Sequence, residues 1–214
     1  MITLADIQGS VVTFLNLGGP VVAVLLVLSV ISLATILLKL WHFLSAGVGR
    51  RKGLERALTH WDRGEHAEAR DQARKSRSHI RHVMLEAMET SGSFGPLSER
   101  LTARSEAQTA RLESGFRLLD SIAQIAPLLG LFGTVLGMIE AFRQLQDAGS
   151  SVDPSLLAGG IWVALMTTAV GLAVAMPTAL MLTWLESRIA RDRVFADQAL
   201  HMLLCPAEGL PDAA

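Results

Sequence analysis

The sequence predicts an all-α membrane protein with three transmembrane helices, and two observations carry this prediction. Half of the 214 residues are hydrophobic, and they gather in three long runs that contain no charged side chain. The charge-free intervals run from Asp6 to Lys39, from Asp120 to Glu140 and from Asp153 to Glu186. A helix crosses a bilayer with about 20 apolar residues. Soluble cores are not built from three such runs, so each interval is expected to hold one membrane helix.

The predicted organisation follows the chain in six parts. Residues 1–44 hold an outer N-terminus and the first transmembrane helix, which begins near Gly18. The parts that follow are a cytoplasmic helical segment (45–118), the second transmembrane helix (119–145), a short outer loop (146–155), the third transmembrane helix (156–185) and a cytoplasmic helical tail (186–214). The first helix is not expected to be a cleaved signal peptide, because no Lys or Arg precedes it and its apolar run is too long. The single cysteine, Cys205, cannot form an internal disulfide and suggests no site.

Basic residues predict the orientation of these helices. Segment 45–118 carries most of the Lys and Arg residues, and Arg50, Arg51 and Lys52 follow the first helix directly. The outer loop has acidic residues instead, while the tail after the third helix again carries arginines. Because positive charge near a span favours the cytoplasmic side, the long segment and the C-terminus are expected inside and the N-terminus in the periplasm.

The cytoplasmic segment has the spacing of amphipathic helices. Apolar residues recur at helical intervals in two stripes: Leu54, Ala57, Leu58 and Trp61, then Ile80, Val83, Met84, Ala87 and Met88. The stretch 91–96 is rich in Ser, Gly and Pro and predicts a break. Helical composition resumes over 98–120 and is expected to run into the second membrane helix, and the tail is expected to stay helical to Leu204.

Composition and motifs exclude several classes of function. A net charge of −1 gives no case for nucleic acid. No phosphate-binding loop, nucleophile elbow or zinc motif occurs, so neither an enzyme nor a cofactor is expected. His79 and His82, with His60 and His66 upstream, could be read as a metal site, but solvated helix surface is the preferred reading because no further ligand has a recognisable spacing. The basic residues between Arg50 and Arg81 fit either anionic lipid headgroups or a solvated face that only sets the topology.

Small residues mark the second and third membrane helices as helices that pack closely on others. They recur at intervals of three and four: Ala126, Gly130, Thr134 and Met138; Gly133, Gly137 and Ala141; and Gly160, Ala164, Thr168, Gly171 and Ala175. Small residues let membrane helices approach closely. Thr134 and Thr168 lie centrally in these faces, which favours a polar ring, although each hydroxyl could instead bond only to its own backbone. Thr167 points about 100° away from Thr168 and is expected to pack.

The interiors of the three spans hold no Asp, Glu, Lys, Arg or His, since Lys39, Glu140 and Glu186 lie at span ends. A proton carrier needs a titratable group in the membrane. The chain is therefore either a scaffold, or a partner supplies the carboxylate.

Two motifs resemble the ExbB/TolQ/MotA family of bacterial inner-membrane stators, and ExbB and TolQ more than MotA. The first is Ala126-Pro127-Leu128-Leu129-Gly130-Leu131-Phe132-Gly133-Thr134-Val135-Leu136-Gly137-Met138. The second is Gly160-Ile161-Trp162-Val163-Ala164-Leu165-Met166-Thr167-Thr168-Ala169-Val170-Gly171-Leu172, with Pro177 beyond it. Their order and the three-span topology match the family over nearly the whole chain.

The resemblance implies a homopentamer in which the second and third helices line a lumen, with Thr134 and Thr168 as the lumen-lining pair. It also implies an ExbD/TolR-type partner whose single transmembrane helix carries an aspartate, and a TonB/TolA-type protein that receives the mechanical work. Family members usually have a glutamate where this chain has Val163, about 7.5 Å from Thr168 along the helix.

The sequence thus predicts a non-enzymatic subunit that couples proton flow to mechanical work in the bacterial inner membrane. Two alternatives stay open. The chain could serve another machine, such as envelope constriction, gliding or polymer export. It could also be a non-conducting scaffold, which the absence of a glutamate at Val163 favours.

Overall fold

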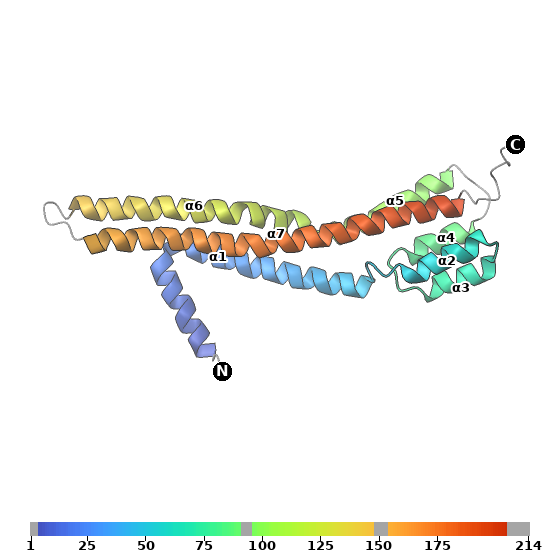
Figure 1. The fold of residues 1–214 in the computed structure, drawn as a ribbon, viewed down its shortest axis with the longest axis horizontal. Helices are drawn as coiled ribbons and strands as arrows, with labels where there is room; N and C mark the ends of the chain where they lie inside the picture. Colours follow the sequence, from blue (N-terminus) through green and yellow to red (C-terminus); the bar gives the residue numbers. More distant parts are fainter. Residues whose placement is uncertain (1–3, 91–95, 148–153, 205–214) are drawn as a thin grey trace. The chain divides into compact units, whose positions relative to one another are not determined.

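A computed structural model describes residues 4–90, 96–147 and 154–204 of the chain. Over these residues it contains helices and no strand, in the order α1 (Leu4–Ala46), α2 (Lys52–Asp62), α3 (His66–Lys75), α4 (Arg81–Glu89), α5 (Pro96–Glu113), α6 (Phe116–Asp147) and α7 (Pro154–Leu204) (Figure 1). Parts of α1, α6 and α7 are long and apolar enough to cross a membrane. The expectation of an all-α protein with three such helices is confirmed.

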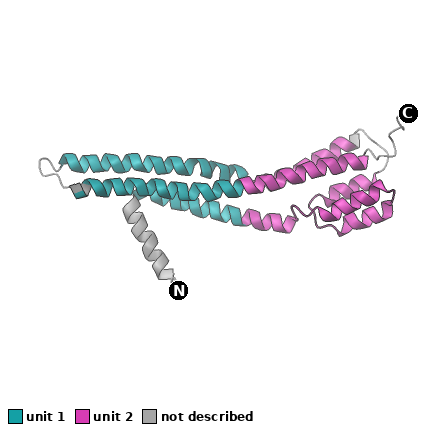
Figure 2. Ribbon diagram, in the orientation of Figure 1, with its two compact units in different colours: residues 1–37, 115–182 teal, residues 38–114, 183–214 magenta. Residues whose placement is uncertain are grey.

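The chain divides into two compact units, shown in different colours in Figure 2. Unit 1 comprises residues 1–37 and 115–182, and unit 2 comprises residues 38–114 and 183–214. Unit 1 holds most of the apolar span of α1 and the apolar parts of α6 and α7. Their contact region buries a small cluster in which Leu25, Ile122, Ala126 and Val174 are packed together.

Helix α1 changes direction at Gly19, where the φ angle is 63°. Glycine has no Cβ and adopts this left-handed conformation without the steric cost of other residues. Pro20 follows and disfavours helical geometry at the residue before it. The part of α1 that is long and apolar enough to cross a membrane runs from Gly19 to Ala46.

One expectation about the helices needs correction. The segment from Ser98 to Asp120 was expected to run unbroken into the second membrane helix, but α5 ends at Glu113 and α6 begins at Phe116. Gly115 lies between them with a φ angle of 84°, a conformation that ends helices. The expected break over residues 91–96 falls mostly outside the described residues, and α5 begins at Pro96.

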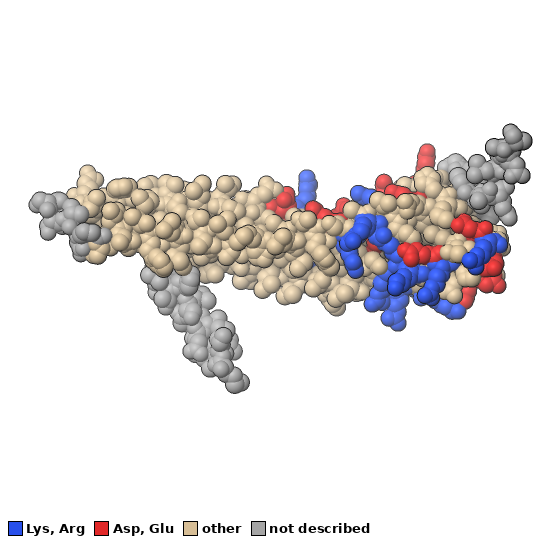
Figure 3. Space-filling model, in the orientation of Figure 1, with Lys and Arg blue, Asp and Glu red and all other residues tan. Residues whose placement is uncertain are grey.

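Unit 2 has a soluble-type core. Helices α2, α3 and α4 pack side by side, and their apolar stripes meet Leu101 of α5 and the end of α7. Both stripes expected from the sequence are buried: Leu54, Ala57, Leu58 and Trp61 on α2, and Ile80, Val83, Met84, Ala87 and Met88 at the start of α4 and along it. On the face drawn in Figure 3, charged side chains gather over this unit.

Unit 1 has the opposite surface, because large apolar side chains cover its helices. Val30 is 68% exposed on α1, Leu131 is 58% exposed on α6 and Leu180 is 73% exposed on α7. Contiguous apolar surface of this kind is unfavourable in water and is stable in lipid. The surface therefore agrees with the composition in placing these helices in a membrane.

Candidate functional site

The candidate site is the contact between α6 and α7, which we call the α6–α7 seam. It consists of small residues from both helices: Ala126, Gly130, Gly133, Gly137 and Ala141 on α6, and Gly160, Ala164, Thr167, Thr168 and Gly171 on α7. A Cβ atom added to Gly130 would lie 3.0 Å from the α carbon of Thr168, and one added to Gly171 would lie 2.6 Å from the carbonyl oxygen of Ala126. The two backbones therefore approach as closely as small-residue faces allow.

Gly133 lies against the side chain of Thr167. An added Cβ would lie 2.6 Å from the Thr167 hydroxyl oxygen and 2.7 Å from its Cβ. Thr167 is only 2% exposed, and its hydroxyl lies 2.7 Å from the Ala164 carbonyl oxygen and 3.2 Å from that of Gly130. Thr167 thus fills the seam as a packed and hydrogen-bonded residue.

Thr168 reaches across the seam. Its hydroxyl donates to the carbonyl oxygen of Gly130 at 3.2 Å, and the side chain is only partly buried. The Thr167 hydroxyl also lies near this oxygen, but a hydroxyl has only one proton to donate, and Thr167 has the shorter bond to the Ala164 carbonyl oxygen. The Gly130 carbonyl oxygen is therefore free to accept from Thr168. Thr168 therefore links the two helices while its oxygen keeps lone pairs that can accept a further hydrogen bond.

Thr134 lies beside the seam and not within it. Its hydroxyl donates to the carbonyl oxygen of Leu131 on its own helix at 2.6 Å. A threonine hydroxyl bonded only to its own backbone was the alternative to a polar role, and Thr134 forms such a bond, to the residue three positions before it. Its oxygen can still accept a hydrogen bond, so a role for Thr134 and Thr168 in a proton pathway stays a prediction.

A cavity of about 360 Å³ lies in unit 1 near the loop-proximal ends of α6 and α7. Val163 lines it, and so does Glu140 of α6, which was set aside in the sequence analysis as a residue at a span end. Glu140 is exposed, and its carboxylate accepts a hydrogen bond from the Gln144 amide at 3.1 Å. Val163, where the family resemblance predicts a glutamate, thus shares one cavity with the carboxylate of Glu140 on the neighbouring helix.

Sequence reasoning missed a buried polar pair between α1 and α7. The hydroxyl oxygens of Ser32 and Thr178 lie 2.6 Å apart, and each residue is at most 3% exposed. Because Thr178 donates to the Val174 carbonyl oxygen at 2.7 Å, Ser32 is the donor to Thr178. No local pattern in the sequence distinguishes Ser32 from Ser29, since only tertiary packing pairs it.

Lys39 ends the first charge-free interval of the sequence. A lysine at a span end can extend its ammonium group to the membrane surface, but Lys39 is 8% exposed in unit 2. Its ammonium group donates to the Leu112 carbonyl oxygen at 3.2 Å and to the Ser114 hydroxyl at 3.0 Å. The last carbonyl groups of a helix lack partners within it, and Lys39 satisfies one such group at the end of α5.

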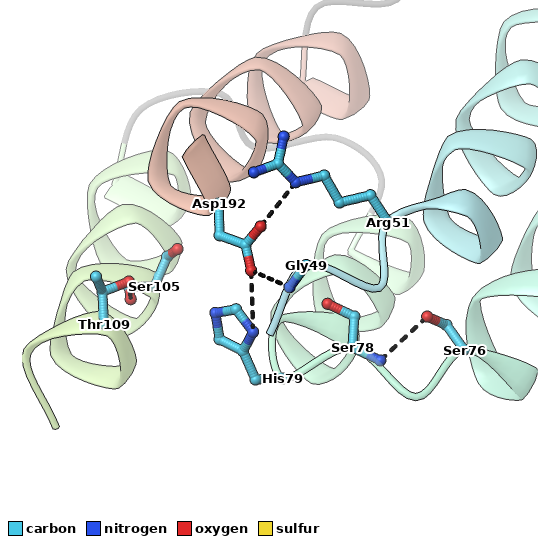
Figure 4. A network of polar contacts seen from close by, with 8 residues as sticks. All are labelled: Gly49, Arg51, Ser76, Ser78, His79, Ser105, Thr109 and Asp192. Carbon is cyan, nitrogen blue, oxygen red and sulfur yellow. Dashed lines mark hydrogen bonds and ion pairs between the residues drawn. The ribbon is translucent and has the colours of Figure 1, made fainter. Parts of the chain in front are cut away.

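Unit 2 contains a second polar centre around Asp192 of α7 (Figure 4). Its carboxylate accepts hydrogen bonds from the Gly49 amide at 2.8 Å and the Arg51 guanidinium at 2.7 Å. His79 Nδ1 lies 3.8 Å from the same carboxylate, and its side chain is 10% exposed. His79 is therefore not solvated helix surface, and that expectation was wrong, whereas His82 is exposed.

Burial lowers the pKa of His79 from its ordinary value of 6.5, and the charge of Asp192 opposes this shift. No group of three or more metal-ligating side chains occurs within the described parts of the chain. The contacts of Asp192 join α7 to the connection between α1 and α2 and to the residues just before α4.

Comparison with known proteins agrees with this architecture. The sequence model of the MotA/TolQ/ExbB proton channel family matches residues 67–195, more than half of the chain. The chain is 33% identical over 174 residues to the putative biopolymer transport protein ExbB-like 1 of Synechocystis, a match covering 74% of this chain and 63% of that protein. It is 43% identical over 88 residues to the biopolymer transport protein exbB1 of Vibrio cholerae, covering 39% of each.

It is also 37% identical over 78 residues to the Tol-Pal system protein TolQ of Haemophilus influenzae, which covers 36% of this chain and 34% of that protein. The matches to these three relatives thus span between about a third and two thirds of their lengths. The family match includes α6 and most of α7, the two helices that form the seam. On this ground the chain belongs to the MotA/TolQ/ExbB proton channel family.

Proposed function

We propose that the chain is a subunit of an inner-membrane complex that converts the proton motive force into mechanical work. One observation carries the proposal. Thr168 in the α6–α7 seam and Thr134 beside it present two hydroxyl oxygens, in spans whose interiors hold no titratable group. Such a surface can pass a proton only together with a carboxyl group from another chain.

The partner in this proposal is a single-span protein of the ExbD/TolR type that carries a membrane aspartate. In the geometry described here both hydroxyls donate to backbone carbonyls, so each oxygen faces a partner as a hydrogen-bond acceptor. A protonated carboxyl group can donate to such an oxygen, whereas a carboxylate cannot. Thr134 and Thr168 would therefore favour the protonated carboxyl group inside the membrane. One charge falling through 100 mV releases about 2.3 kcal/mol, enough to drive a conformational step.

We further propose that five copies surround the partner helices, with α6 and α7 toward the lumen, and that movement of this ring acts on a TonB/TolA-type protein. The membrane portions agree with a multi-pass protein of the bacterial inner membrane. In this arrangement the N-terminus is periplasmic, and residues 45–118 and the C-terminal tail are cytoplasmic.

The orientation has a direct test. In a Cys205→Ser background, a single cysteine at position 60 should be protected from an impermeant thiol reagent added to intact spheroplasts, and one at position 150 should react. The reason is the excess of Lys and Arg in unit 2. Labelling at position 60 from outside would overturn the orientation.

Glu140 provides a carboxylate in the cavity that Val163 lines, and we propose that it receives protons there in place of the family glutamate. The Glu140→Gln variant keeps the size of the side chain and removes its charge, so proton flux should fall. The Val163→Glu change in that background should restore flux, because it returns a carboxylate to the same cavity. Unchanged flux in Glu140→Gln would remove Glu140 from the pathway.

The function itself is tested by proton flux into liposomes that contain the purified chain with and without its co-purified single-span partner. Flux that depends on the partner supports the proposal. Flux without a partner would contradict it, since the interiors of this chain's spans hold no titratable group of their own.

A non-conducting membrane scaffold is the second candidate, and Val163 is the observation that favours it. A scaffold would assemble with the partner and show no flux in either liposome preparation. A stator that serves another machine would conduct, and the protein captured with the complex would differ from the TonB/TolA type.

A further inference from the structure

A basic pocket lies at the end of the apolar span of α1. It is a cavity of about 520 Å³ within unit 2. Residues 44–47 at the end of α1 form one side, and residues 77–82 around the start of α4 contribute Ser78 and four basic side chains to the other. Arg50 completes the lining.

The charge of the pocket is positive. Its lining includes Arg50, Arg77 and Arg81 together with two histidines, and it includes no carboxylate. Among the described residues, none of these three arginines forms an ion pair, whereas the neighbouring Arg51 is paired with Asp192 at 2.7 Å. Within the described parts of the chain, Arg81 donates only to the Ser76 carbonyl oxygen and to His82. Three guanidinium groups therefore converge on one cavity without an acidic partner.

The backbone holds these arginines in place. Gly47 has a φ angle of 69°, and a Cβ atom added to it would overlap the carbonyl oxygen of Arg77. The turn after α1 thus passes directly against the Arg77 backbone, a contact that only glycine permits. The turn is closed by hydrogen bonds from the Val48 amide to Phe43 at 3.2 Å and from the Arg50 amide to Gly47 at 3.1 Å.

The position of the pocket identifies the kind of ligand. The apolar span of α1 ends at Ala46, which itself lines the cavity. Trp41 and Leu44 lie within the last two turns of that span and are 71% and 65% exposed. Exposed tryptophan is typical of the membrane–water interface. The pocket therefore lies at the depth of lipid headgroups.

We propose that this pocket binds the phosphate of an anionic phospholipid headgroup. Guanidinium groups pair with phosphate oxygens in a bidentate geometry, and basic clusters beside a membrane helix attract anionic lipids. Bound lipid would join the end of α1 to the start of α4, next to the Asp192 centre. The proposal does not depend on proton conduction by the chain.

The test titrates the detergent-purified full chain with short-chain phosphatidylglycerol or phosphatidylcholine and counts bound lipid by native mass spectrometry. Detergent removes any effect of insertion orientation. The Arg50→Gln/Arg77→Gln variant removes two exposed pocket charges, and Arg56→Gln/Arg63→Gln removes two exposed charges elsewhere on unit 2. The circular dichroism of both variants should match that of the wild type, because none of these four side chains is buried.

The wild type should bind phosphatidylglycerol in preference to phosphatidylcholine. The pocket variant should bind phosphatidylglycerol about thirty-fold more weakly, from about 1 kcal/mol for each basic residue near the surface, and the control variant should bind as the wild type does. Equal binding by the two variants would overturn the proposal. Displacement of the lipid by millimolar inorganic phosphate would assign the pocket to a soluble anion instead and would also overturn it.

Discussion

Gly133 offers the sharpest test of the α6–α7 seam. In the Gly133→Ala variant, the new methyl group would lie 2.6 Å from the Thr167 hydroxyl oxygen, well inside ordinary van der Waals contact. Thr167 has nowhere to move, because it is 2% exposed and bonded to the Ala164 carbonyl oxygen. The helices must separate, or Thr167 must lose its hydrogen bonds.

The expected loss can be worked out from these contacts. Overpacking of a core costs about 1–3 kcal/mol, and a lost hydrogen bond within a membrane bundle costs about 0.6 kcal/mol. Alanine regains about 0.5–1 kcal/mol over glycine within a helix. The free energy of unfolding should therefore fall by about 2 kcal/mol.

Gly159→Ala is the matched control. Gly159 lies on α7 close to the same seam, and a Cβ atom added there meets nothing within 4 Å. This variant should be as stable as the wild type or slightly more stable, so the two variants should differ by about 2.5 kcal/mol, or about sixty-fold in the unfolding equilibrium.

The measurement is unfolding of each full-length variant in detergent by titration with dodecyl sulfate, followed by circular dichroism. Gly133→Ala should unfold at a lower dodecyl sulfate fraction than both the wild type and Gly159→Ala. Coincident curves for the two variants would show that the helices are not packed at Gly133 as described. The larger Gly133→Leu change should also prevent assembly, so an intact oligomer in native mass spectrometry would argue against the seam.

Two further predictions concern polar side chains. The Thr134→Val and Thr168→Val variants should assemble and lose partner-dependent proton flux, because valine cannot accept a hydrogen bond. The Thr167→Val variant should lose stability more than flux. Full flux in the first two variants would leave only backbone bonding for these hydroxyls. The free energy of unfolding should fall as the pH drops below about 6.5, because burial lowers the pKa of His79 in the folded state and the unfolded chain then binds the proton more readily. The charge of the neighbouring Asp192 opposes this effect. The His79→Gln variant should lose this part of the pH dependence, and an unchanged pH profile in that variant would show that His79 does not contribute.

The fold class was predictable because each of its signals is local. A run of about 20 uncharged residues marks a membrane helix wherever it occurs, and apolar residues at helical spacing mark a buried stripe, as on α2 and α4. The family resemblance was likewise readable from two continuous motifs on α6 and α7. The helix break at Gly115 was missed because mixed charges on both sides have helical composition, and only the backbone conformation shows the turn.

The sequence by itself determined which residues are small or polar in the membrane helices, and hence that two helices pack closely around threonines. Only the tertiary structure decided which threonine does which task. Thr167 and Thr168 are adjacent in the chain, but their side chains leave the helix about 100° apart, so one fills the seam against Gly133 and the other bridges to Gly130. The tertiary structure also decided three other features: the cavity shared by Glu140 and Val163, the Ser32–Thr178 pair and the Asp192 centre. Each joins residues from different helices, and a pairing of this kind depends on how the helices pack and leaves no local pattern to read.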